Sequence, residues 1–357
     1  MGDSQQKVKK DKKPLYFLIG VFVTIVFLMT FIAKPSTHNK AIRELGQSSN
    51  IKDVKELWFK YKTDLSQDEE FLQEIRKKID AVKLSEDEVN TCLDWLPPAP
   101  KSINLIIIPD LSRRIIDVNN NEQIKNDKFV LGEIWKAFKD FSKLRQNTKD
   151  RLMVDVTDID QANGQFRSIA DSLQFDLSSH KEQSNRLFFK PDIDKRFDEY
   201  INKMYELAKQ QPLGADYRFY FRRYLKNRLK KRTLYDDYFN KVIIITDGYL
   251  ETEDSHADTK ISGFENQLHQ AVLDKNILSI IAKNGLNIPK EDIDLSKTEI
   301  LVCEVNERES GKGFDFEILK TYWEDWFKRM NTKKIVFIQR EQANDITAKI
   351  VKEFIAN

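Results

Sequence analysis

Two short apolar runs, each followed by an aspartate, constrain the fold of this chain more than any other feature of its sequence. The first run is residues 103–108, with Asp110 close behind it, and the second is residues 242–245, with Asp247 close behind it. Runs that are rich in β-branched residues and apolar on both faces are typical of strands buried inside a sheet that helices cover on each side. Because the carboxyl ends of parallel strands form the ligand-binding edge of such a sheet, the sequence predicts that two carboxylates meet there.

Strand-like and helix-like segments alternate through residues 101–357. Further strands are predicted at 151–156, near 172–177, at 299–305 and at 334–338. Helices are predicted at about 128–147, 192–210, 217–231, 261–275, 314–330 and 342–355. Residues 278–282 form either a strand or a continuation into the next turn. This alternation predicts an α/β fold with a mostly parallel central sheet and helices on both faces.

The amino-terminal part of the chain predicts a membrane anchor. Residues 15–33 carry no charge and are long enough to cross a bilayer as one helix. The residues that follow make a poor signal-peptidase site, which favours an uncleaved anchor over a cleaved signal peptide. Lysines concentrate in residues 1–14, so the positive-inside rule places that tail in the cytoplasm and the main domain outside it. The expected organisation is tail (1–14), anchor (15–33), helical region with a Pro-rich linker (34–100) and α/β domain (101–357).

The helical region between anchor and main domain has two possible roles. Apolar residues recur at helical spacing between residues 40 and 96, and Ser85 with Glu88 forms a capping-box sequence. These helices form either a partner-binding stalk or a small subdomain packed on the main fold. The Pro-rich segment 97–100 is a stiff linker to the first strand of the sheet.

The two strand ends resemble the metal-ion-dependent adhesion site of the von Willebrand factor A (vWA) family. In that family the first strand ends in Asp-x-Ser-x-Ser, and a later strand ends in an aspartate, commonly within Thr-Asp-Gly. Asp110 and Ser112 match the first motif, and the Thr-Asp-Gly around Asp247 matches the second. Arg114 replaces the third hydroxyl residue, and no Gly-Thr loop precedes the helix before the second strand. The resemblance spans about residues 101–357.

The resemblance implies a magnesium or manganese ion at this edge. Asp110 and Ser112 would bind the ion, with Asp247 acting directly or through water, and Asp216 stands where the family's threonine would fall. Oxygen ligands of this kind suit hard cations. Two alternatives remain open: the aspartates simply cap the turns and helices that follow them, or Arg114 supplies positive charge in place of the ion.

Residues around the strand ends are candidates for contact with a partner. Arg113 and Arg114 follow the first strand, and the acidic loop after the second strand contributes Tyr249 and Glu251. Arg114 would point toward the metal position, or away from it to pair with Asp117 or that loop.

The helix predicted at 217–231 contains no acidic residue, and Phe221 and Leu225 begin an apolar stripe along it. Arg218 and Arg222 would then form either a basic partner surface or an ordinary solvated face.

We expect a membrane-anchored, vWA-like protein-binding module in an envelope-associated complex, because members of that family mostly recognise proteins. A magnesium-dependent hydrolase that uses Asp110, Asp216 and Asp247 to activate water is an alternative. A metal-free scaffold, in which Arg114 replaces the ion, is another. We find no nucleophile–base arrangement and no ligand spacing among the histidines, which argues against an enzyme. Export of the domain would disfavour nucleic acid as a partner.

The topology can be tested with reporter fusions at the carboxyl terminus. Because the lysine cluster precedes the apolar segment, a reporter that works only after export should be active, and a cytoplasmic reporter at the same position should be silent. Activity of the cytoplasmic reporter alone would reverse the orientation and revive nucleic acid as a partner of the basic helix.

Overall fold

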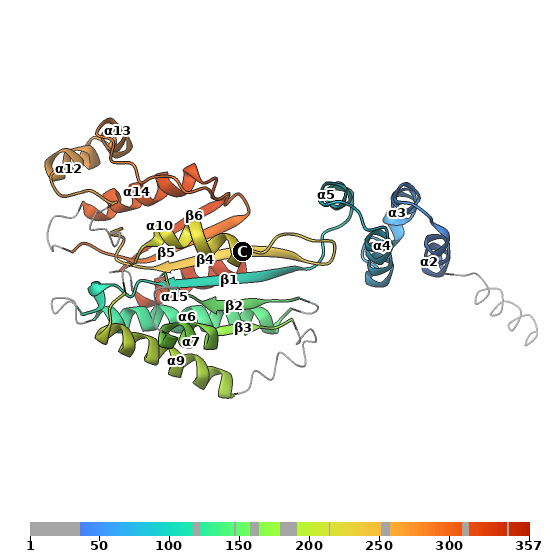
Figure 1. The fold of residues 1–357 in the computed structure, drawn as a ribbon, viewed down its shortest axis with the longest axis horizontal. Coiled ribbons are helices and arrows are strands. Elements are labelled where there is room, and N and C mark those ends of the chain that lie inside the picture. The colour runs from blue at the N-terminus through green and yellow to red at the C-terminus, as the bar shows by residue number, and fades with distance from the viewer. Residues whose placement is uncertain are drawn as a thin grey trace, which may run out of the picture. The chain divides into compact units, whose positions relative to one another are not determined.

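The chain divides into two compact units, Met1–Pro97 and Pro98–Asn357. The computed structural model (Figure 1) describes residues 36–116, 122–145, 148–157, 164–178, 191–213, 215–250, 258–308, 314–340 and 343–357. The predicted tail and anchor lie outside these residues. Within them, no helix is long and apolar enough to cross a membrane.

The described part of the first unit is helical. Its elements are α2 (Thr37–Gln47), α3 (Ile51–Leu65), α4 (Glu69–Ala81) and α5 (Glu86–Trp95). Phe71 of α4 is fully buried, and its ring contacts those of Trp58 and Tyr61 of α3. The capping box that begins α5 is formed as predicted, because the Ser85 side chain accepts from the Glu88 backbone N–H and the Glu88 carboxylate accepts from the Ser85 backbone N–H.

The second unit is an α/β fold around one sheet, as the alternation of segments predicts. Its described strands are β1 (Lys101–Pro109), β2 (Arg151–Val154), β3 (Gln174–Asp176), β4 (Asp237–Ile245), β5 (Thr298–Val305) and β6 (Lys334–Gln339). They form a six-stranded sheet in the order β3-β2-β1-β4-β5-β6. Neighbouring strands are parallel, except that the edge strand β3 runs antiparallel to β2.

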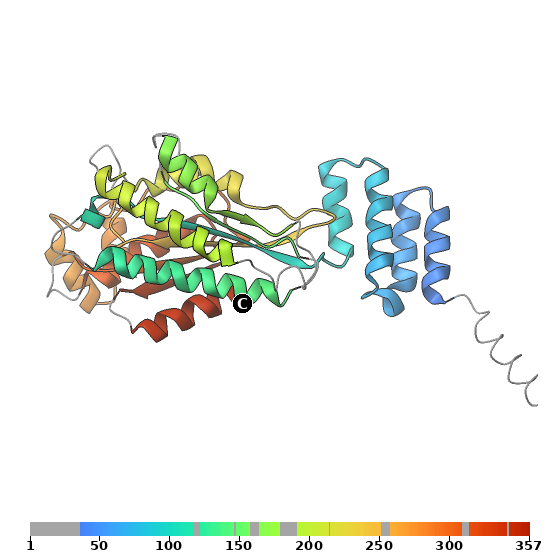
Figure 2. The ribbon, with the colours of Figure 1, turned by 90° about the horizontal axis from the view of Figure 1, so that it is seen from below.

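Helices cover both faces of this sheet (Figures 1 and 2). The helices are α6 (Gln123–Lys143), α7 (Gly164–Ser172), α9 (Pro191–Gln210), α10 (Tyr217–Tyr220), α11 (Lys226–Arg228), α12 (Glu265–Leu273), α13 (Ile277–Lys283), α14 (Asp315–Arg329) and α15 (Asn344–Ala356). Alternate residues of β1 enter different cores: Ile107 packs with residues of α6, α9 and α15, whereas Ile106 and Ile108 pack with residues of α10 and α14. This two-sided burial is why residues 105–108 are apolar throughout, whereas Asn104 is buried with its side chain hydrogen-bonded to Asn240.

Three segments differ from the sequence-based expectation. Residues 278–282 belong to helix α13, so the strand alternative was wrong. The helix predicted at 217–231 is shorter and contains a π-helical segment, η2 (Phe221–Leu225), between α10 and α11. Helix α7 lies in a stretch for which polar composition predicted no helix.

A buried lysine fixes the last helix against the middle of the sheet. Lys241 of β4 is 1% exposed, and its Nζ donates to the Glu299 carboxylate at 2.8 Å and to the Phe354 carbonyl of α15 at 2.6 Å. Burial lowers the pKa of Lys241, while Glu299 opposes that effect. Both acceptors are therefore needed to offset the free-energy cost of burying the Lys241 ammonium.

The turn that follows β4 depends on Gly248. Its φ of 97° favours glycine, and a Cβ at this position would lie 3.0 Å from Cγ1 of Val305. We expect Gly248→Ala to lower the free energy of unfolding by about 1–3 kcal/mol, measured by urea denaturation. Gly132→Ala, within α6 where a Cβ would meet nothing within 4 Å, is the matched control and should stabilise by about 0.5–1 kcal/mol. Equal effects of the two substitutions would contradict the strained turn.

Candidate functional site

The two predicted aspartates follow neighbouring strands of the sheet. Strands β1 and β4 pair directly, with Pro109 opposite Ile245, and the Asp110 backbone N–H donates to the Ile245 carbonyl at 2.8 Å. The Thr246 hydroxyl then donates to Oδ2 of Asp110 at 2.8 Å. The ends of β1 and β4 therefore meet as predicted, and side chains from both contribute to one cluster.

N–H and O–H donors surround the Asp110 carboxylate. Oδ1 accepts from the Ser112 backbone N–H at 2.9 Å, and Oδ2 lies 3.2 Å from Nε of Arg114 in addition to its bond from Thr246. Ser112 thus contacts Asp110 through its backbone amide. Three donors therefore offset the cost of burying the Asp110 carboxylate.

Arg114 lies at the centre of the cluster. It belongs to the 3₁₀ helix η1 (Arg113–Ile116), and its side chain is 3% exposed. Its Nη2 donates to Oδ2 of Asp127 at 2.8 Å and to the Ile245 carbonyl at 3.1 Å, while Nε donates to the Asp110 carbonyl at 3.1 Å. The side chain therefore points into the strand-end cluster, one of the two directions that the sequence left open.

Asp127 of α6 completes the ion pair and is itself saturated with donors. Gln123 donates to its Oδ1 at 2.7 Å, and the Tyr205 hydroxyl of α9 donates to its Oδ2 at 3.0 Å. Burial raises the pKa of Asp127 above its usual value, whereas the Arg114 guanidinium opposes that rise. Although burial alone would lower the pKa of Arg114, the carboxylates of Asp127, Asp110 and Asp247 raise it well above its usual value. Arg114 therefore stays charged inside the fold.

A second arginine contacts the other predicted ligand. Nε of Arg308 donates to Oδ2 of Asp247 at 2.9 Å, and its guanidinium lies 4.4 Å from the centroid of the Tyr249 ring. The Tyr249 hydroxyl donates to Oδ2 of Asp315 at 2.7 Å, and Nε2 of His269 lies 3.5 Å from the other oxygen of Asp315. Burial raises the pKa of Asp247, and Arg308 opposes that rise. The Arg308 side chain is 40% exposed, so this part of the site reaches solvent.

Asp216 and Arg218, two further residues predicted for the site, make contacts of their own. Asp216 caps α10, where its carboxylate accepts from the Phe219 backbone N–H at 2.8 Å. Arg218 pairs with Glu291 at 2.9 Å and Asp258 at 3.2 Å, so acids from distant segments neutralise part of the basic helix.

Arg222 lies 3.8 Å from Glu291, with 56% of its side chain exposed. Arg113 is exposed. Glu251 lies outside the described residues.

The charged residues Asp127, Arg308 and Glu304 are among the members of this region that were not predicted from the sequence. Asp127 lies in the second turn of α6, but the helix was predicted to begin at residue 128, which left Asp127 in a loop. Glu304 lies inside the end of β5, and Arg308 lies shortly after it. The only signal in the sequence was a polar residue after an apolar run. Glu304 is 4% exposed and has a φ of 69°, an uncommon conformation for a non-glycine residue.

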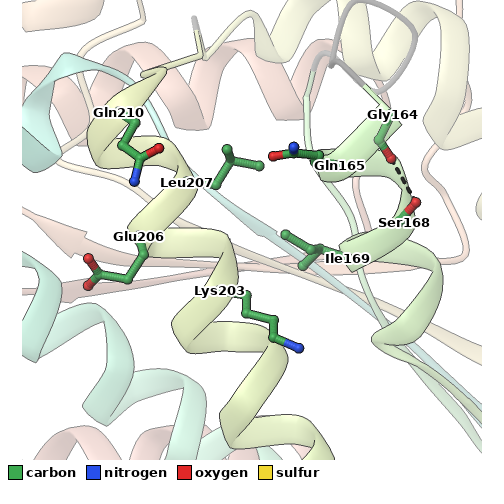
Figure 3. A pocket seen from close by; sticks show the side chains of 8 residues that line it. All are labelled: Gly164, Gln165, Ser168, Ile169, Lys203, Glu206, Leu207 and Gln210. Atoms are coloured by element: carbon green, nitrogen blue, oxygen red, sulfur yellow. Dashed lines mark hydrogen bonds between the residues drawn. The ribbon is translucent and has the colours of Figure 1, made fainter.

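A separate open pocket of about 540 Å³ lies between α7 and α9 (Figure 3). Its charged lining residues are Lys203 and Glu206, which pair with Glu199 and Lys209 respectively. The predicted site residues that the structure describes lie elsewhere. The pocket thus combines paired charges with shallow walls, and it offers no convergent set of polar groups for a small molecule.

The described residues contain no group of three or more His, Cys, Asp and Glu side chains that could hold a metal ion. No family model, curated protein or solved structure matches the chain. Any functional assignment must therefore be based on the geometry at the carboxyl ends of β1 and β4.

Removal of the Asp127 charge tests the central ion pair. We expect Asp127→Asn to lower the free energy of unfolding by about 3–5 kcal/mol, because Arg114 would lose a buried partner. Asp140→Asn, an exposed position on the same helix, is the matched control and should change stability by less than about 0.5 kcal/mol. Urea denaturation measures both variants. A similarly small effect of the two substitutions would show that the pair contributes little.

Proposed function

We propose that residues 98–357 form a vWA-like protein-recognition domain in which Arg114 takes the place of the metal ion. Residues 15–33 would anchor this domain to a membrane, with the domain on the extracytoplasmic side. The observation that carries the proposal is the position of the Arg114 guanidinium, 3.2 Å from Oδ2 of Asp110 and 2.8 Å from Oδ2 of Asp127 in a fully buried cluster.

The charges of the region support an arginine in place of the ion. A divalent cation at this edge would offset the charges of Asp110 and Asp247. Instead, Arg114 contacts Asp110, and Arg308 contacts Asp247. The two guanidinium groups carry the same total charge as one magnesium ion. They also occupy carboxylate oxygens that an ion would need as ligands. The carboxylate oxygens of Asp110 and Asp247, as arranged, fit two arginines better than a divalent metal ion.

The position of the cluster in the sheet supports a binding role. The strand order reverses direction at β1 and β4, which is the topological switch point where ligands bind in open α/β sheets. Asp110 and Asp247 follow these two strands. A binding surface at this edge is therefore consistent with the protein-recognition function that the vWA resemblance implies.

Arg308 and Tyr249 are the groups through which this edge would contact a partner. The guanidinium stacks on the ring of Tyr249 and is partly exposed, which fixes its orientation while it remains accessible. Planar guanidinium groups bind carboxylates with two parallel hydrogen bonds. An acidic side chain of a partner protein would compete with Asp247 for Arg308.

The hydrolase alternative receives less support. It needs Asp110, Asp216 and Asp247 to share an ion, but the Asp216 carboxylate accepts a backbone hydrogen bond at the start of α10. Arg114 and Arg308 would also have to leave their carboxylates before an ion could bind.

Metal titration of the full-length chain and its Arg114→Ser variant tests the proposal. Magnesium or manganese should leave the melting temperature of the wild type unchanged. Arg114→Ser should lower the melting temperature, because two buried carboxylates lose their cation. Either ion should then restore part of the loss, since a ligand at about 100 times its Kd stabilises by about 2.7 kcal/mol, or a few degrees.

Arg113→Ser, which removes the exposed neighbouring arginine, is the matched control and should respond to neither ion. A metal-induced increase in the wild type that Asp110→Ala abolishes would contradict the proposal, because it would show that the ion binds while Arg114 is present.

A further inference from the structure

Strand β5 contains a bulge that changes the direction of Glu304. The register between β5 and β6 shifts between Val302 and Val305, so that one extra residue lies on β5. Val302 and Val305 both pack in the core beneath α14, whereas Cys303 packs in the opposite core. Glu304 is therefore the extra residue of the bulge. Bulges commonly redirect a side chain next to a functional site.

The backbone of the bulge does not require a glutamate. The φ of Glu304 is 69°, in the left-handed region that glycine adopts without strain. Residues held in such conformations often occur at functional sites, where the surrounding structure compensates their strain. The role of Glu304 must therefore come from its carboxylate and the groups around it.

Those groups leave the carboxylate poorly compensated. Glu304 is 4% exposed, and its Oε2 is buried without a hydrogen-bond partner among the described residues. The charged groups that act on it are Asp127 of α6, Arg340 after β6 and Arg114 after β1. The Cys303 thiol on the same strand is a further titratable group, and burial raises its pKa well above the usual value. Burial, reinforced by Asp127, raises the pKa of Glu304 to about 7.

Arg340 connects Glu304 to the buried ion pair. Nη1 of Arg340 donates to Oε1 of Gln123 at 3.1 Å, and Gln123 in turn donates to Oδ1 of Asp127 at 2.7 Å. Arg114 is already held by Asp110 and Asp127. Arg340 donates to the neutral Gln123 and otherwise acts on the solvent-exposed Glu122 at the start of α6, so no buried acid among the described residues holds it. It is therefore the cation that an ionised Glu304 would attract.

We propose that Glu304 is a proton-operated switch that controls the first turn of α6 and, through it, the Arg114–Asp127 pair. In the neutral form, Arg340 holds Gln123 at the start of the helix. When Glu304 releases its proton to water, Arg340 leaves Gln123 and pairs with the new carboxylate. The switch does not depend on what the strand-end edge binds, so a failure of the protein-recognition proposal would leave it untouched.

The sign of the pH dependence follows from the raised pKa. An acid whose pKa is higher in the folded than in the unfolded chain stabilises the fold at low pH, and this contribution is lost as the pH rises through the folded-state value. For Glu304 the loss should begin as the pH rises above the usual value of 4.5 and should level off above the folded-state pKa of about 7. Between pH 6 and pH 8, its ionisation should reduce the folding equilibrium constant by about tenfold.

Urea denaturation of the full-length chain at pH 6 and pH 8 tests the switch. The wild-type midpoint should be lower at pH 8, and Glu304→Gln, which cannot ionise, should lose most of that difference. Glu304→Gly should lose it as well and should be more stable than Glu304→Gln at both pH values, because glycine relieves the strained φ. Glu291→Gln, which removes a buried carboxylate paired with Arg218, is the matched control and should keep the wild-type pH dependence.

Hydrogen exchange tests the connection to α6. At pH 8, the amides of residues 126 and 127, which make the first hydrogen bonds of α6, should exchange faster in the wild type than in Glu304→Gln, while at pH 6 the two proteins should match. Unchanged wild-type stability between the two pH values, or an equal pH dependence in Glu304→Gln, would overturn the titration. Equal exchange in α6 at pH 8 would overturn the coupling to the helix.

Discussion

The buried guanidinium of Arg114 is the interaction on which the strand-end region depends. Carboxylates from β1 and α6 lie inside the fold, where an uncompensated charge would cost several kcal/mol. Arg114 contacts both of them and also donates to the carbonyl of Ile245 at the end of β4. One side chain therefore joins two central strands and a helix, and loss of its charge would affect all three elements.

The two arginines of the region have different environments and so suit different tasks. Arg114 is held by Asp110, Asp127 and backbone carbonyls, and its side chain is too deeply buried to contact a partner. Arg308 is partly exposed and stacks on an aromatic ring. The first preserves the arrangement of the strand ends, and the second presents charge at their surface. One arginine is therefore committed to the fold, while the other is available at the surface.

The sheet and the meeting of β1 and β4 could be predicted because strands that are buried on two faces are rich in apolar residues. Such a run can be recognised in a short stretch of the sequence. The sequence could not predict Asp127 as a partner, since that contact depends on where α6 begins. It could not predict the bulge at Glu304 either, because an extra residue changes the pairing of two strands and leaves no local pattern in the sequence. The basic helix appeared unpaired for a related reason: the acids that neutralise Arg218 come from segments 40 and 73 residues away.

The buried Lys241 sets an order for the biosynthesis of this chain. Its ammonium is enclosed in the middle of the sheet, yet one of its two partners, the Phe354 carbonyl, lies 113 residues further along the chain. While the ribosome is still making the intervening segments, β4 cannot bury this lysine with its full set of acceptors. Lys241 therefore gains its full set of acceptors only after α15 has been synthesised. A stop codon before α15 would leave a lysine with an incomplete partner set beneath an uncovered apolar surface, a feature that quality-control proteases and chaperones recognise.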